Sequence, residues 1–133
     1  MPTIQHTEKL RTIAENFRLA LITLFGSQAT GKTHPGSDMD IAVLAEKELR
    51  PRELAEIASE LAAALGVKEV DITDLHNAAP LLLANVARSS QLLYEKNPSG
   101  FARFRIYAMK RFMEARPLFL MRDALLVKRF KRI

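Results

Sequence analysis

Apolar residues recur along this chain with two periods, and these periods predict an alternation of helices and strands. Spacings of three and four residues are typical of the buried face of a helix. They predict helices over residues 5–18, from Pro51 to Gly66, over residues 79–89 and from Phe101 onwards. Pro51 suits a first helical turn and Gly66 suits a left-handed C-terminal cap, so these two residues mark the ends of the second helix.

Short apolar or alternating runs between the helices predict strands. The runs cover residues 19–25, 40–46, 67–75 and, as a shorter fourth strand, 91–96. Residues 31–37 contain two glycines and a proline and are expected to form a loop. The resulting order predicts an α/β (α+β) fold in which a small mixed sheet is flanked by helices. We expect a single domain, with a core over residues 1–96 and a helical extension over residues 97–133.

The composition of the chain does not alter the predicted fold, but it excludes disulfide-bonded and membrane-spanning proteins. The chain has 133 residues, 48% of them apolar and 26% charged, which is typical of one globular domain with a real core. It has no cysteine, so disulfides and thiolate metal sites are excluded. The N-terminal stretch has no apolar run of the signal-peptide type, and the longest apolar runs are too short to span a bilayer. A cytoplasmic protein is therefore expected.

Two phosphate-handling signatures overlap between residues 24 and 44. Read from Gly26, the segment GSQATGKT fits the P-loop pattern, which would make Lys32 and Thr33 the nucleotide ligands. A P-loop runs directly into a helix, whose N-terminus binds the phosphates. Here Thr33 is followed by a loop that contains Pro35 and then by a strand, so the P-loop interpretation is disfavoured.

The second signature is Gly-Ser, ten residues, and Asp-Met-Asp. Alternate residues of a strand point to one face, so Asp38 and Asp40 would lie side by side if strand pairing begins at Asp38. Mg²⁺ is the ion that such a pair of carboxylate ligands would bind, whereas the alternative is that Asp38 caps a turn and Asp40 begins a solvent-facing strand edge. Asp71 lies within an apolar strand, where an ionised carboxylate needs a cation unless the strand is an edge that faces water. Ser27, directly after a buried strand, suits a helix N-cap whose free N–H groups bind phosphate.

These motifs, in this order, resemble the minimal nucleotidyltransferase (MNT) family of the DNA-polymerase-β-like nucleotidyltransferase superfamily. The resemblance covers roughly residues 5–96. It implies that Gly26 and Ser27 hold the triphosphate of ATP and that Asp38 and Asp40 bind Mg²⁺. It also implies that Asp71 completes the carboxylate triad. Asp74 is the less suitable third carboxylate, because it would face the other side of the strand, and Lys32 becomes a loop residue that could contact a phosphate.

The resemblance also implies an activity and a partner. Small proteins of this family are similar to the antitoxins of two-gene systems whose toxin is a HEPN-domain ribonuclease. The implied reaction, with two Mg²⁺ ions, moves AMP from ATP to a tyrosine of that toxin. Two alternatives stay open, namely a small-molecule nucleotidyltransferase of the aminoglycoside type and a non-catalytic antitoxin that only binds its toxin.

The basic residues are concentrated in the tail. Residues 1–102 carry ten Lys or Arg and thirteen Asp or Glu, a net charge of −3, whereas residues 103–133 carry ten Lys or Arg and two acidic residues, a net charge of +8. Phe101, Phe104, Ala108 and Phe112 are expected to cover the core. Pro117 is expected to interrupt the helix, and the basic amphipathic helix after it to dock the toxin or a second copy of the chain. Membrane and nucleic-acid binding are disfavoured, because the tail lacks Trp and a base-stacking platform.

Overall fold

Four strands form one mixed sheet in the order β3-β2-β1-β4. The structure, a computed structural model, describes residues 4–25 and 39–131. The strands are β1 (Leu19–Phe25), β2 (Met39–Ala45), β3 (Val70–Asp74) and β4 (Gln91–Glu95). β1 is antiparallel to both β2 and β4, whereas β2 and β3 are parallel and are joined by the helix α3 (Pro51–Leu65). The prediction of a small mixed sheet is confirmed, and so are its four strands.

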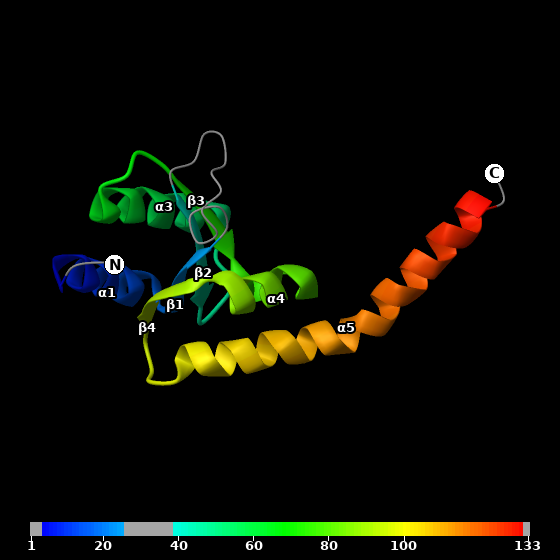
Figure 1. The fold of residues 1–133 in the computed structure, drawn as a ribbon. Coiled ribbons are helices and arrows are strands. Elements are labelled where there is room, and N and C mark those ends of the chain that lie inside the picture. Colours follow the sequence, from blue (N-terminus) through cyan, green and yellow to red (C-terminus); the bar gives the residue numbers. More distant parts are fainter. Residues whose placement is uncertain (1–3, 26–38, 132–133) are drawn as a thin grey trace.

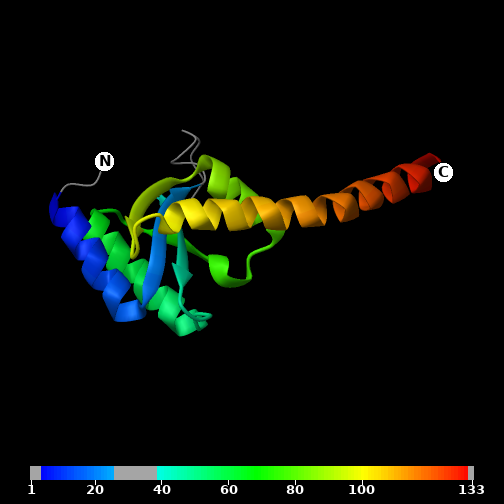
Figure 2. The same ribbon diagram turned by 90° about the horizontal axis from the view of Figure 1, so that it is seen from below.

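Helices cover both faces of this sheet (Figures 1 and 2). On one face lie α1 (Ile4–Phe17) and α3, and on the other lie α4 (Pro80–Ser89) and α5 (Gly100–Lys131). The alternation along β2 divides the core accordingly: Ile41 and Val43 pack towards α1 and α3, and Ala42 packs towards α4 and α5. A single turn of 3₁₀ helix, η1 (Leu75–Asn77), follows β3.

Both ends of α3 are set by residues that the sequence marks. Pro51 is the first helical residue, and the backbone N–H of Arg50 donates to the Glu53 carboxylate at 3.1 Å. Gly66 has φ 69°, in the left-handed region, and its N–H donates to the carbonyl of Ala62. These are the proline start and the glycine cap that the sequence predicts.

The prediction that Pro117 ends a helix is wrong. α5 is a single helix of 32 residues with Pro117 inside it. The Glu95 carboxylate accepts a hydrogen bond from the Phe101 N–H at 2.9 Å and so caps its start. An internal proline removes one hydrogen bond and crowds the preceding turn, which bends a helix as readily as it ends one. Figure 1 shows the axis of α5 changing direction in its orange part, between the yellow first half and the red end.

The first half of α5 belongs to the folded body, as predicted. Phe104 and Ala108 are buried with α4 in the second core, and Phe101 packs against them, whereas Phe112, the fourth predicted residue, is half-buried outside this cluster. Figures 1 and 2 show the second half of the helix projecting beyond the body. Within the described ranges, no helix combines the length and the apolar character needed to cross a lipid bilayer. The division into a core up to residue 96 and an extension from residue 97 stays a prediction.

Candidate active site

Asp40 is a buried carboxylate at the start of β2. Its side chain is only 5% exposed. Met39 and Ile41 on either side of it pack into the core beneath α1 and α3, so Asp40 points to the opposite face of the sheet, the same face as Ala42. A carboxylate in such a position costs free energy unless a cation or hydrogen-bond donors stabilise it.

Asp71 is the neighbour of Asp40 on the next strand. The two residues are register partners in the parallel pair of β2 and β3, and therefore lie on one face of the sheet. Adjacent strands are about 4.8 Å apart, which brings both carboxylates within reach of a single ion. Asp71 is exposed, because β3 is an edge strand of the sheet. The structure therefore shows the alternative that the sequence left open for Asp71, an edge strand that faces water, and the assignment of Asp71 to the carboxylate triad stays a prediction.

The other predicted site residues lie outside the described part of the chain. These are Gly26, Ser27, Lys32 and Asp38. Gly26 directly follows Phe25, and Phe25 is the register partner of Asp40 on β1. Asp38 directly precedes β2 in the sequence. Among the described residues, Phe25, Asp40 and Asp71 therefore lie side by side on three neighbouring strands, at the end of the β1–β2 pair where the described part of β1 stops and that of β2 begins.

Asp74 is committed to the backbone. One of its carboxylate oxygens accepts a hydrogen bond from His76 N–H at 3.0 Å and the other from Leu49 N–H at 3.3 Å. It thereby caps η1 and ties the end of β3 to Leu49, two residues before the start of α3. This structural role agrees with the expectation that Asp74 is the less suitable third carboxylate.

Two further polar groups near β2 belong to the scaffold. Thr23, which the sequence did not single out, is fully buried, and its hydroxyl donates to the Ala42 carbonyl at 3.4 Å. Glu46, beyond the other end of β2, forms an ion pair with Lys96. The hydrogen bond from Lys96 lowers the pKa of Glu46, and the same bond raises the pKa of Lys96. Glu46 and Lys96 are both exposed, and Glu46 lies beyond the end of β2 opposite to Asp40, which makes Glu46 a useful comparison residue.

The carboxylate pair fits a magnesium ion. Oxygen ligands on adjacent strands, one of them buried, suit a hard cation that also binds phosphate oxygens. No cluster of three His, Cys, Asp or Glu side chains occurs within residues 4–25 and 39–131. The predicted third ligand, Asp38, lies outside those ranges.

Residues 8–99 match the family model described as polymerase beta, nucleotidyltransferase. This match covers the whole sheet and the helices α3 and α4. The chain belongs to this nucleotidyltransferase family. The family membership confirms the predicted fold and the prediction of an enzyme of the nucleotidyltransferase class.

Two relatives share a more specific name. The chain is 36% identical over 95 residues to the protein adenylyltransferase MntA of Shewanella oneidensis, and the match covers 71% of this chain and 68% of the relative. It is 30% identical over 120 residues to the protein adenylyltransferase MntA of Aphanizomenon flos-aquae, with 78% and 77% covered.

Solved structures with the same fold come from toxin–antitoxin complexes. One is a crystal structure of a toxin–antitoxin with AMP-PNP, with a TM-score of 0.66 and 30% identity over 90% of this chain and 98% of the matched chain. Another is a complex of a tri-AMPylated HEPN toxin of Shewanella oneidensis with its MNT antitoxin, with a TM-score of 0.63, 27% identity and 90% and 96% covered. The predicted resemblance to the MNT family is confirmed by these relatives.

Proposed function

We propose that this protein transfers AMP from ATP to a tyrosine hydroxyl of a cognate HEPN-domain toxin and thereby acts as its antitoxin. The proposal rests above all on the pairing of Asp40 with Asp71 in a chain that is 36% identical to a protein adenylyltransferase. The relatives solved with AMP-PNP and with an AMPylated HEPN toxin support the donor and the class of acceptor. Because the reaction consumes ATP, which is a cytoplasmic metabolite, the proposal includes a cytoplasmic location for the protein.

The nucleotide would be held at the end of the β1–β2 pair. We assign Gly26 and Ser27 to the triphosphate, with Lys32 as an additional phosphate contact. Asp38, Asp40 and Asp71 would hold two Mg²⁺ ions, which supply charge neutralisation for the acceptor oxygen and for the departing pyrophosphate.

In the reaction, the acceptor oxygen forms a bond to the α-phosphorus of ATP while the bond from that phosphorus to the pyrophosphate oxygen breaks. The proton of the acceptor hydroxyl goes to a carboxylate, and Asp71 is the suitable one because its exposed position admits a bulky protein acceptor. Asp40, which is buried, keeps a fixed orientation and holds the nucleotide end of the site. Catalysis then depends mostly on positioning and on electrostatic stabilisation.

The acceptor class is tested by incubating the protein with ATP labelled at the α-phosphate, Mg²⁺ and the HEPN-domain protein encoded beside it. A parallel reaction replaces that protein with a small-molecule extract of the same cells. We expect label on the HEPN protein and, by mass spectrometry, an adenylyl group on tyrosine. Label confined to small molecules would contradict the proposal and favour a small-molecule nucleotidyltransferase.

A further inference from the structure

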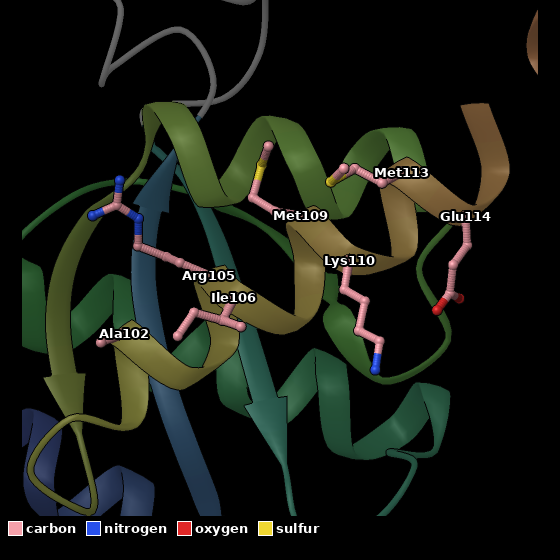
Figure 3. Close-up of a pocket in the computed structure, with 7 residues that line it drawn as sticks. All are labelled: Ala102, Arg105, Ile106, Met109, Lys110, Met113 and Glu114. Carbon is pink, nitrogen blue, oxygen red and sulfur yellow. The ribbon is translucent and has the colours of Figure 1, made fainter.

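The outward side of α5 carries apolar residues that the body of the protein leaves uncovered. Ile106 is 70% exposed and Met113 is 67% exposed. Phe104 and Ala108, two residues before and after Ile106 on the same helix, are by contrast buried in the core. Ile106 and Met113, together with Ala102 and Met109, line a shallow groove (Figure 3). Isolated exposed apolar residues are ordinary, but a continuous row of them marks an interaction surface.

The spacing of this row is that of a helix-pairing seam. Ala102, Ile106, Met109 and Met113 follow one another at intervals of four, three and four residues, which is the spacing of the apolar positions in a coiled coil. The core contacts of α5 use a different set, which includes Phe104 and Ala108. The helix therefore has two apolar sides, one buried in its own body and one turned outwards.

The row continues beyond the proline. Leu120, Ala124 and Val127 follow at the same helical spacing, and all three are exposed. Seven turns of an ideal helix contain about 25 residues, which is the separation of Ala102 from Val127. This part of α5 projects from the body, so its apolar side chains gain no burial within the chain (Figures 1 and 2).

The flanks of the row are basic on balance. Arg105 lies on one side of the groove and Lys110 on the other (Figure 3). Beyond the groove, Arg116 and Lys128 continue the two flanks at helical spacing. Glu114 lines the end of the groove and Asp123 follows Arg116 on its flank, so basic residues outnumber acidic ones by four to two along the row. In helix pairs, residues beside the apolar seam select the partner by their charge. Two copies of this chain that paired along the row would bring basic flanks together, which disfavours a second copy as the occupant.

We infer that this outward side of α5, the row Ala102, Ile106, Met109 and Met113 with its continuation after Pro117, binds an amphipathic helix whose apolar seam is flanked by acidic residues. The identification of the partner as the HEPN-domain toxin rests on the proposed function. Docking at α5 raises the effective concentration of the acceptor at the active site without contacting the reacting atoms. It is thus expected to act on the KM for the toxin and to leave kcat unchanged.

Two double variants test the surface. Ile106→Ser with Met113→Ser removes the exposed seam, and Arg105→Glu with Lys110→Glu reverses the flanking charge. Each is expected to raise the Kd for the purified toxin, measured by calorimetry, at least about tenfold, and to raise the KM for toxin similarly at constant kcat. The effect of the charge reversal should shrink as salt is increased.

Matched controls carry the same chemical changes elsewhere. Leu81→Ser removes an exposed apolar residue of α4, and Arg11→Glu reverses an exposed charge of α1. Both are expected to stay within about twofold of wild type, and circular dichroism should show unchanged helix content in all variants.

Three results would overturn the inference. The first is a toxin affinity that neither double variant changes although the wild type binds and modifies the toxin. The second is equal weakening by the controls. The third is a wild-type dimer in light scattering that the Ile106→Ser/Met113→Ser variant dissociates, which would assign the row to a second copy. A wild-type protein that binds the toxin through this row but transfers no AMP would instead contradict the proposed function alone.

Discussion

Two neighbouring carboxylates with different exposure define the site at the scale of single residues. Asp40 is buried and Asp71 is open to solvent, although they are register partners on one face of the sheet. Like charges on adjacent strands repel each other, and a divalent cation removes that repulsion. The proposal assigns the fixed, buried carboxylate to the nucleotide and the exposed one to the acceptor.

The two carboxylates should make the thermal stability of the protein depend on Mg²⁺. Mg²⁺ with a non-hydrolysable ATP analogue should raise the Tm of the wild type, because a ligand that binds only the folded state stabilises it. Asp40→Asn should remove most of this increase, and should leave the Tm without metal equal or higher, since one of two repelling charges is gone. Differential scanning fluorimetry measures both quantities. An equal metal-induced increase in the variant would show that Asp40 is not a ligand.

Asp74 provides the contrasting case of a structural carboxylate. Asp74→Ala removes the acceptors of His76 N–H and Leu49 N–H, so the free energy of unfolding should fall by about 1–2 kcal/mol. Transfer activity per folded molecule should stay close to that of the wild type. Chemical denaturation and a transfer assay well below the Tm separate the two effects. If the variant is stable but inactive, Asp74 rather than Asp71 completes the triad.

Lys32 distinguishes the proposed site from a P-loop. In a P-loop enzyme, the loss of this lysine nearly eliminates ATP turnover, because it contacts the β- and γ-phosphates. In the proposed site Lys32→Ala should reduce AMP transfer only about tenfold, which corresponds to about 1.4 kcal/mol. Steady-state kinetics with ATP as the varied substrate would measure the change. Complete loss of transfer in Lys32→Ala, together with an active Asp40→Asn, is the outcome that would reverse this assignment.

At the scale of the elements, the sequence was sufficient to predict those features that depend on residues close to one another in the chain. The period of the apolar residues predicted every described strand, and Pro51 and Gly66 predicted both ends of α3. The prediction at Pro117 failed, because a proline either bends or ends a helix according to whether the chain after it still favours helix. Here the residues after Pro117 include Leu, Met, Ala and Arg, which favour helix. The exposure of Asp71 was left open for another reason: the sequence does not state the order of strands, so it could not show that β3 lies at an edge.

The end of α3 gives a test at this scale. Gly66 adopts φ 69°, and nothing lies within 4 Å of a Cβ built there, so backbone strain and not a steric clash opposes substitution. Gly66→Ala should lower the free energy of unfolding by about 1 kcal/mol. Gly66→Asn should cost less, because asparagine tolerates this region better. Urea denaturation compares the two variants, and equal stabilities for Gly66→Ala and the wild type would contradict the capping role.

For the whole molecule, charge and shape point to a partner. Residues 103–133 carry a net charge of +8, whereas the rest of the chain carries −3. Most of this positive charge lies on a helix whose second half projects from the body with exposed Leu120, Leu125 and Val127 (Figure 2). A helix with apolar residues on several sides is normally covered. Its covering must come from outside the chain, and the basic residues favour an acidic partner.

Deletion of residues 117–133 tests this separation of roles. Because Phe104 and Ala108 precede the deletion, the body should keep its Tm within a few degrees. Toxin binding and toxin modification should both weaken, whereas any slow hydrolysis of ATP at the site of Asp40 and Asp71 should be spared. Calorimetry and the labelling assay report on the two roles. Undiminished toxin affinity in the truncated protein would show that the projecting half of α5 serves another purpose.

The most direct test of the account is the effect of one buried carboxylate on AMP transfer to the toxin. Asp40→Asn and Glu46→Gln neutralise acidic residues near the two ends of β2, and Glu46 is exposed and paired with Lys96. With saturating ATP, Mg²⁺ and purified toxin, we expect Asp40→Asn to lower kcat by at least about a hundredfold, or about 2.7 kcal/mol, while Glu46→Gln keeps it within about twofold. Equal rates of toxin labelling by the wild type and by Asp40→Asn would contradict the assignment of this site.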